Sequence, residues 1–401
     1  MEHMRHSGHS TGPALRGRAW LVAVVALTGL LAPPGAAASP SVERIGLGVA
    51  DASGVRTAEV ALEERLVVPV AGGARTRQLD TAAYAMVGVT WRGDAEPAVR
   101  VRSRSAGSWT GWRPLEVLHD GPDGPGAAGS GETSSARGTH PVWVDDSDGV
   151  QVEVTGADTA RALTLVLIDP GSRAADAAST PSVPAARAAV PGLARAAKPS
   201  RAPRPALRTR SDWGANERWR DGRPSYNRQL KQVHIHHTVN ANNYSRRDVP
   251  GLLRGMYRYH TKSLGWSDIG YNFLVDRFGR IWVGRAGGPA NRVRGAHTLG
   301  FNHTSVGIAV IGNHETTRPT RATMNALVAL SAWKLDKADS GAVGRVWGRS
   351  EGSDRYPART RVRLPIIDGH RDTNETACPG QLLYDRLPNL RGRAQKRIDR
   401  F

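Results

Sequence analysis

Three histidines fall within four positions of the segment KQVHIHHTVN, residues 231–240. Imidazole is the commonest metal ligand in proteins and titrates close to neutral pH. In a β-strand, alternate side chains point to opposite faces, so His234 and His236 would share one face and His237 would lie on the other. Two ligands do not complete a zinc site, which takes three or four. The cluster therefore predicts a metal site whose other ligands come from elsewhere in the chain.

The segment GHRDTNETACPG, residues 369–380, can supply the missing ligands. His370 follows a short apolar run, and Cys378 is the single cysteine of the chain, so it has no partner for an internal disulfide. A loop of this length can bring an imidazole and a thiolate to one ion. Two histidines and one cysteine leave a fourth position for water, as in catalytic zinc sites. The alternatives are a small buried hydrophobe or a nucleophile paired with His370.

The elements around these segments predict an α/β region with a central mixed β-sheet flanked by helices. Apolar residues after Asp248 recur at helical spacing, and Gly279 supplies the positive φ of a tight turn. We expect a strand at 230–238, a helix at 248–265, a hairpin at 271–285, a strand at 305–313, a helix at 320–338, a strand ending at His370 and a closing helix after Pro379.

The part of the chain before this region has a different pattern. Short alternating segments such as 98–105 and 150–154, with glycine-rich turns, predict a β-sandwich-like domain at 39–170. Trp109 and Trp112 suit either packing or stacking on sugar rings. Residues 171–207 are rich in Ala, Pro and Arg without apolar periodicity, which predicts a linker before a C-terminal domain at 208–401.

The N-terminus predicts secretion. Arginines precede the apolar run from Trp20 to Leu31, and small residues follow at 36–38, which is typical of a cleaved signal peptide at 1–38. The run is shorter than the roughly 20 residues that span a bilayer, so we expect no stable membrane span after cleavage. The formal net charge of +19 favours an anionic partner. Outside the cell, an anionic cell-wall polymer is favoured over nucleic acid.

The C-terminal region resembles the peptidoglycan recognition proteins and the related zinc-dependent N-acetylmuramoyl-L-alanine amidases of type 2. The motifs that carry this resemblance occur in the family's order and are, taken together, highly specific. They are RSDWGA (210–215), HIHHT (234–238), YHTKSLGWSDIGYNFLVDRFGRIWVGR (259–285), GAHTLGFNHTSVGIAVIG (295–312) and GHRDTNETACPG (369–380). The domain at 39–170 and the linker lie outside the resemblance.

The resemblance implies a zinc ion and a role for each matching residue. It implies the metal ligands His236, His370 and Cys378, the catalytic residues Tyr271 and Thr376, and the substrate-binding residues His260, Trp266, His297 and Asn302. Thr376 stands where the phage enzymes carry lysine, as in the recognition-protein branch. The general base stays open between Tyr271 acting through water and the nearby Asp372 and Glu375.

The activity implied is hydrolysis of the amide between N-acetylmuramic acid and L-alanine in peptidoglycan, by a protein that is secreted or associated with the cell wall. A muropeptide-binding protein without catalysis is the alternative, and the presence of all three ligands favours the enzyme. A cysteine nucleophile would leave HIHHT and Tyr271 unexplained. Arg285, Arg292 and Arg294 suit the extra carboxylate of diaminopimelate in the stem peptide.

Overall fold

The computed structural model describes residues 44–123, 134, 136–156, 161–177 and 201–401. The predicted signal peptide and residues 178–200 of the predicted linker lie outside these ranges. Residues from Glu43 onward belong to one unit, in which the N-terminal strands and the C-terminal region contact each other.

The N-terminal region is one antiparallel sheet of ten strands, in which the order β1-β10-β4-β9-β3-β2 is extended by β5 to β8. The long central strands run side by side and enclose an apolar cluster that includes Val87, Val152 and Leu165. The strands are β1 (Arg56–Ala61), β2 (Leu66–Val70), β3 (Gly73–Thr76), β4 (Leu79–Arg92), β5 (Ala98–Ser105), β6 (Ser108–Trp109), β7 (Arg113–Leu115), β8 (Arg137–Gly138), β9 (Val142–Thr155) and β10 (Arg161–Asp169).

Strands β4 and β10 are buried on both faces because the second face packs on the C-terminal region. Met86 and Ile168 belong to the same apolar cluster as Leu252 and Met256 of α1 (Asp248–Arg258). A Cβ on Gly255 would lie 2.2 Å from the sulfur of Met86, so a larger residue here would force the Met86 side chain to shift. The packing of this sheet on α1 positions the loops at its edge over the C-terminal region.

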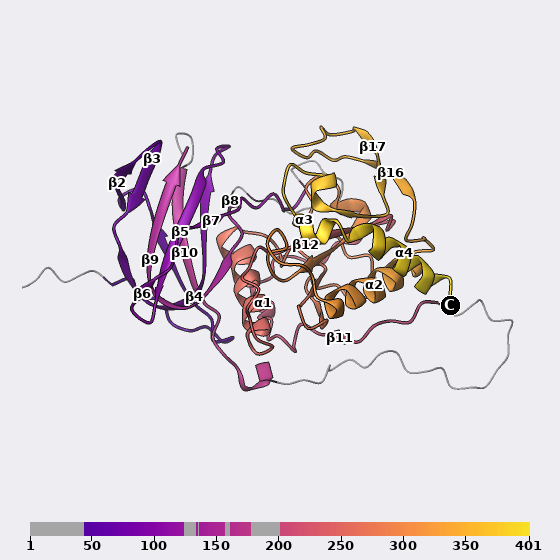
Figure 1. Cartoon of the computed structure of the whole chain (residues 1–401), viewed down its shortest axis with the longest axis horizontal. Helices are drawn as coiled ribbons and strands as arrows, with labels where there is room; N and C mark the ends of the chain where they lie inside the picture. Colours follow the sequence, from indigo (N-terminus) through magenta and orange to yellow (C-terminus); the bar gives the residue numbers. More distant parts are fainter. Residues whose placement is uncertain (1–43, 124–133, 135, 157–160, 178–200) are drawn as a thin grey trace, which may run out of the picture. The chain divides into compact units, whose positions relative to one another are not determined.

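The C-terminal region is built on a mixed sheet of six strands in the order β11-β14-β13-β15-β12-β18. Helices α2 and α4 lie side by side against one face of this sheet (Figure 1) and contribute Leu327 and Leu390 to its core. The strands are β11 (Leu207–Arg208), β12 (Gln232–His237), β13 (Phe273–Val275), β14 (Ile281–Val283), β15 (Ser305–Val310) and β18 (Ile367–Gly369). The remaining elements are α2 (Arg321–Asp336), α3 (Gln381–Tyr384), α4 (Leu387–Ile398) and a separate hairpin of β16 (Arg345–Arg349) and β17 (Arg361–Pro365).

The predicted α/β class, with a mixed sheet and a preceding β domain, is confirmed. The helix predicted at 248–265 differs in its last turn, because α1 ends at Arg258 and a π-helical turn follows at Tyr259–Ser263. This wide turn buries two successive side chains in different surroundings. The Tyr259 hydroxyl donates to the Val89 carbonyl (3.1 Å), and His260 Nδ1 accepts from the Gly270 N–H (3.2 Å).

The described ends of the predicted linker are packed. Asp176 is buried and pairs with Arg254 of α1 (2.8 Å), and Ala202 is buried against the end of α2, where its N–H donates to Asp336. Trp109 and Trp112 stack against Arg102, at 5.1 and 5.2 Å from the ring centroids. None of the helices in the described ranges has the length and apolarity needed to cross a membrane.

Candidate metal centre and active site

The parallel pairing of β12 with β18 sets two histidines next to each other. Ile235 lies opposite Gly369 in the register, so His236 and His370 are the next residues at the carboxyl ends of neighbouring strands. Their ring centroids are 4.6 Å apart, and both side chains are buried. Carboxyl ends of parallel strands meet at one edge of a sheet, which is where ligands of α/β proteins bind.

Cys378 returns to this edge through the loop that follows His370. Its Sγ lies 3.8 Å from His236 Nδ1 and accepts the backbone N–H of His237 at 3.4 Å. The candidate ligand atoms of His236, His370 and Cys378 all lie within 4.8 Å of one another. Two imidazoles and a thiol at this spacing are a donor set that suits zinc. The three residues can therefore hold one metal ion.

His236 is oriented by a second contact on its other ring nitrogen. Its Nε2 lies 3.1 Å from Nδ1 of His297, which is itself fully buried. Burial lowers the pKa of His236 and of His370 well below the usual value, so both imidazoles are neutral and free to ligate. A partner on the second nitrogen fixes the tautomer and direction of a metal-binding histidine.

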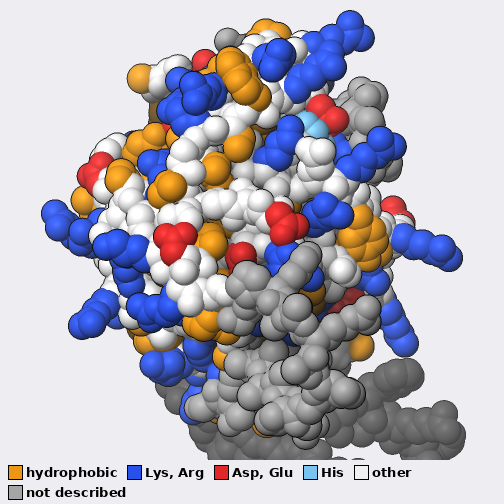
Figure 2. Space-filling view, turned by 90° about the vertical axis from the view of Figure 1, so that its right-hand side faces the viewer, with side chains coloured by type: hydrophobic (Ala, Val, Ile, Leu, Met, Phe, Trp, Pro, Cys, Tyr) orange, Lys and Arg blue, Asp and Glu red, His pale blue; other side chains and the backbone are white. Residues whose placement is uncertain are grey.

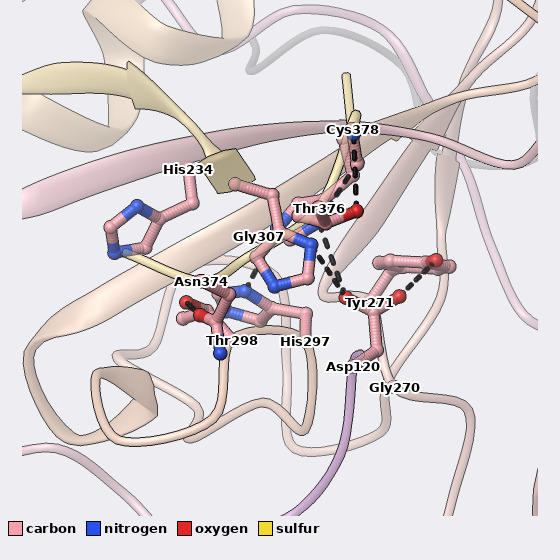
Figure 3. A network of polar contacts seen from close by, with 12 residues as sticks. Asp120, His234, Gly270, Tyr271, His297, Thr298, Gly307, Asn374, Thr376 and Cys378 are labelled. Atoms are coloured by element: carbon pink, nitrogen blue, oxygen red, sulfur yellow. Dashed lines mark hydrogen bonds and ion pairs between the residues drawn. The ribbon is translucent and has the colours of Figure 1, made fainter. Parts of the chain in front are cut away.

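Tyr271 lies beside this cluster, with its ring 5.4 Å from that of His236. Burial raises the pKa of Tyr271 well above its usual value, and the nearby carboxylate of Asp120 raises it further. The phenol is therefore protonated and donates its hydrogen bond to Asp120 Oδ2 (2.5 Å), as the dashed line in Figure 3 shows. A neutral phenol at this position can donate to an oxygen on which negative charge develops.

The other residues implied by the resemblance surround the same site. Thr376 Oγ1 accepts the backbone N–H of Cys378 at 3.2 Å, which steadies the cysteine. His260 and Trp266 stack with centroids 4.4 Å apart, and burial lowers the pKa of His260 to about 3. Asn302 accepts the His297 N–H at 2.8 Å.

The remaining sequence candidates point elsewhere. His234 contacts Asp368 (2.5 Å) away from the candidate ligands, and His237 Nδ1 accepts the His314 N–H. Asp372 accepts hydrogen bonds from Tyr384 and the Gly369 N–H, and Glu375 is exposed. Neither Asp372 nor Glu375 therefore faces the cluster as a general base.

Asp120, which comes from the N-terminal region, was not predicted from the sequence as a site residue. Its Oδ1 lies 3.4 Å from Nδ1 of His236 and 3.3 Å from Nδ1 of His370, and its side chain is 1% exposed. In the sequence it appears only as an acidic residue in the segment HDGPDG, residues 119–124. That segment lies outside every motif of the C-terminal region, so nothing in the sequence linked it to the histidines.

Comparison with protein families finds two matches along the chain. Residues 226–381 match the family described as N-acetylmuramoyl-L-alanine amidase. Residues 49–188 match the family described as Rv3811 N-terminal galactose-binding domain-like.

Individual relatives agree with the first match. Peptidoglycan-recognition protein SC2 of Drosophila melanogaster is 31% identical over 181 residues, which cover 45% of this chain and 83% of that protein. An N-acetylmuramoyl-L-alanine amidase of Homo sapiens is 32% identical over 190 residues, covering 46% of this chain and 28% of that protein. Among solved structures, Drosophila PGRP-LB is 30% identical with a TM-score of 0.36, covering 45% of this chain and 91% of that one.

Proposed function

This chain belongs to the family of peptidoglycan-recognition proteins and N-acetylmuramoyl-L-alanine amidases, and we propose that it is a catalytic member. In this proposal it is a secreted zinc hydrolase that cleaves the amide between N-acetylmuramic acid and the L-alanine of the stem peptide. The observation that carries the proposal is the convergence of His236, His370 and Cys378 beside the phenol of Tyr271.

Each residue of the site has a task in this reaction. His236, His370 and Cys378 would hold zinc, which supplies Lewis-acid activation of water and of the amide carbonyl. The Tyr271 hydroxyl donates to the former carbonyl oxygen as negative charge builds there, and such a donor is worth about 3 kcal/mol of transition-state stabilisation. Thr376 positions Cys378 through its backbone N–H.

The buried side chains around the site would bind the substrate. The His260 ring lies between Tyr271 and Trp266, and Asn302 contacts His297, so these residues have the ring and amide groups that a sugar-peptide ligand uses. His297 contacts His236 directly, which favours a positioning role for this residue. Arg294 pairs with Asp123 and Glu351, and Arg285 donates to Ser267, so neither guanidinium is poised for a ligand in this conformation.

The arrangement of the whole chain fits an extracellular enzyme. We assign residues 1–38 to a signal peptide, 39–170 to a β domain, 171–207 to a linker and 208–401 to the amidase domain. The chain carries a formal net charge of +19, which favours association with anionic cell-wall polymers.

One basic surface for such a polymer is the hairpin of β16 and β17. Arg345, Arg349, Arg361 and Arg363 are exposed on it beside Trp347, which is 53% exposed. The Arg361 guanidinium stacks on the Trp347 ring at 5.1 Å. Lys and Arg side chains are also spread over the face shown in Figure 2.

The test is made on the full-length protein. We expect about one zinc per chain by elemental analysis and free stem peptide, detected by mass spectrometry, when the protein acts on muropeptides. A chelator should stop the release, and added zinc should restore it.

The other outcomes separate the alternatives. Cleavage that proceeds without metal would overturn the zinc mechanism and return Cys378 to the role of nucleophile. Zinc binding without any cleavage would place the chain among the proteins that bind muropeptides without hydrolysing them.

A further inference from the structure

Asp120 reaches the metal cluster from a different part of the fold. It lies between β7 and β8 of the N-terminal sheet, whereas every other residue of the cluster belongs to the C-terminal region. Its Oδ1 faces Nδ1 of both His236 and His370 but accepts no hydrogen bond, although the atom is fully buried. A buried carboxylate oxygen without a donor is costly unless a cation completes its surroundings.

The distances from Asp120 Oδ1 to the two imidazole nitrogens fit those between neighbouring ligands of one metal ion. Zinc bonds of about 2.0–2.3 Å in tetrahedral geometry place neighbouring ligand atoms about 3.3–3.6 Å apart. Asp120 Oδ1 lies 3.4 and 3.3 Å from the two imidazole nitrogens, within this range, whereas the sulfur of Cys378 lies 3.8 Å from His236 Nδ1, slightly beyond it. We propose that Asp120 is the fourth protein ligand of the zinc ion and that it holds the amidase in a latent form.

The same carboxylate also binds Tyr271, the second group that we assign to catalysis. Asp120 Oδ2 accepts the hydroxyl of Tyr271 at 2.5 Å (Figure 3). A substrate amide would need the open metal position and the Tyr271 donor at the same time. Asp120 occupies both, so it competes directly with the scissile amide.

The residues after Asp120 contact the residues that we assign to substrate binding. The Asn302 side-chain amide donates to the Gly121 carbonyl (3.0 Å) and to Asp123 Oδ1 (2.9 Å). Asp123 also accepts the Gly300 N–H (2.8 Å) and pairs with Arg294 (2.6 Å). A Cβ on Gly121 would lie 3.8 Å from the ring of Trp266. Residues 120–123, which we call the plug, therefore cover groups that we assign to substrate binding.

Peptidoglycan can reach the site only when the plug withdraws. Tyr271, His236, Asn302 and Cys378 are each at most 1% exposed. A polymeric substrate cannot reach atoms at that depth. The inference rests on the proposed function, since a latent form has meaning only for a zinc enzyme.

The experiment compares four full-length proteins. They are the wild type, Asp120→Asn, which keeps the size of the side chain, Asp120→Ala, and the control Asp146→Asn, which changes an exposed aspartate of the same sheet. Zinc affinity is measured by competition with a chromophoric chelator, and stem-peptide release is followed by mass spectrometry. Circular dichroism checks that each variant is folded.

We expect both Asp120 variants to bind zinc more weakly than the wild type. A residue that only hydrogen-bonds to a metal ligand contributes about 10- to 100-fold to metal affinity, so the loss of a direct ligand should weaken binding by at least that factor. We expect both to release stem peptide faster than the wild type, and Asp146→Asn to match the wild type in both measurements. Unchanged zinc affinity in folded Asp120 variants would show that Asp120 is not a ligand. Slower cleavage by both variants would make Asp120 a catalytic group and overturn the latent form.

A measurement on the unaltered protein covers the case in which the variants do not fold. In the cobalt-loaded wild type, four protein ligands leave no position for added azide, so the visible spectrum should not change. A spectral shift with azide would reveal an open position and contradict the proposal. A wild type that binds neither zinc nor cobalt would instead overturn the proposed function itself. Metal binding without cleavage by any of the four proteins would also count against the enzyme.

Discussion

Two histidines of β12, His234 and His236, lie two positions apart, and each faces a buried aspartate. The two aspartates differ in the hydrogen bonds that they accept. Asp368 accepts hydrogen bonds on both oxygens, from His234 (2.5 Å) and from the Gln232 side chain (3.2 Å). Asp120 accepts one, from Tyr271, and its other oxygen faces His236 and His370 without a hydrogen bond. Protein donors therefore satisfy both oxygens of Asp368, whereas one oxygen of Asp120 keeps lone pairs that suit a cation.

The difference teaches how to separate a histidine that is paired within the protein from a candidate metal ligand in the same strand. Burial, residue type and strand face are the same for His234 and His236, so none of these properties distinguishes them. What distinguishes them is whether the partner carboxylate is fully hydrogen-bonded within the protein. Substitutions around His236 should therefore change metal binding, whereas substitutions around His234 should change stability.

The largest effect is expected from Cys378→Ser. A serine hydroxyl stays protonated at neutral pH and is a poor zinc ligand. Zinc affinity should therefore fall by more than the roughly 10- to 100-fold that is lost when a residue hydrogen-bonded to a metal ligand is removed. Hydrolysis should disappear with the metal. Elemental analysis after dialysis checks this, and a variant that retains one zinc per chain would remove Cys378 from the ligand set.

On the His234 side, Asp368→Asn should affect stability rather than metal binding. Removing one partner of a buried pair typically costs about 3–5 kcal/mol in the free energy of unfolding. Denaturant titration measures this, with the exposed Asp385→Asn as a control that should change little. If folded Asp368→Asn lost its zinc while keeping its stability, His234 and not His236 would be the ligand.

Tyr271→Phe should lower the rate while leaving zinc in place. Loss of one oxyanion donor typically lowers kcat about 10²- to 10³-fold. The comparison is made in the Asp120→Ala background, so that loss of the hydrogen bond to Asp120 does not contribute. Tyr226→Phe, at a residue that is 55% exposed, is the matched control. Equal rates for Tyr271→Phe and the control would show that the phenol is not a catalytic group.

The smallest effect is expected from Thr376→Val. This change removes the acceptor of the Cys378 N–H, a hydrogen bond worth about 1 kcal/mol. Zinc affinity and kcat should each fall several-fold, whereas the exposed Thr316→Val should have no effect. A loss as large as that of Tyr271→Phe would give the Thr376 hydroxyl a direct contact with the substrate.

Much of the C-terminal fold could be predicted from the sequence because its signals are local. The strand at HIHHT, the hairpin with Gly279 at positive φ, and the helix at 321–336 follow from periodicity and turn chemistry. The end of α1 could not, because the π-helical turn depends on what Tyr259 and His260 contact in different parts of the molecule. The hairpin of β16 and β17 was also missed, since its alternating arginines resemble a solvated loop.

The sequence by itself determined which residues of the C-terminal region we assign to the proposed chemistry, because a strand, a loop and their motifs hold these residues in a fixed local order. Only the tertiary structure decided what faces them. Asp120 and Tyr271 are 151 residues apart, and they meet because the N-terminal sheet packs on α1 through side chains such as Met86. No local pattern encodes such a contact, since it depends on the complementary shapes of two distant surfaces.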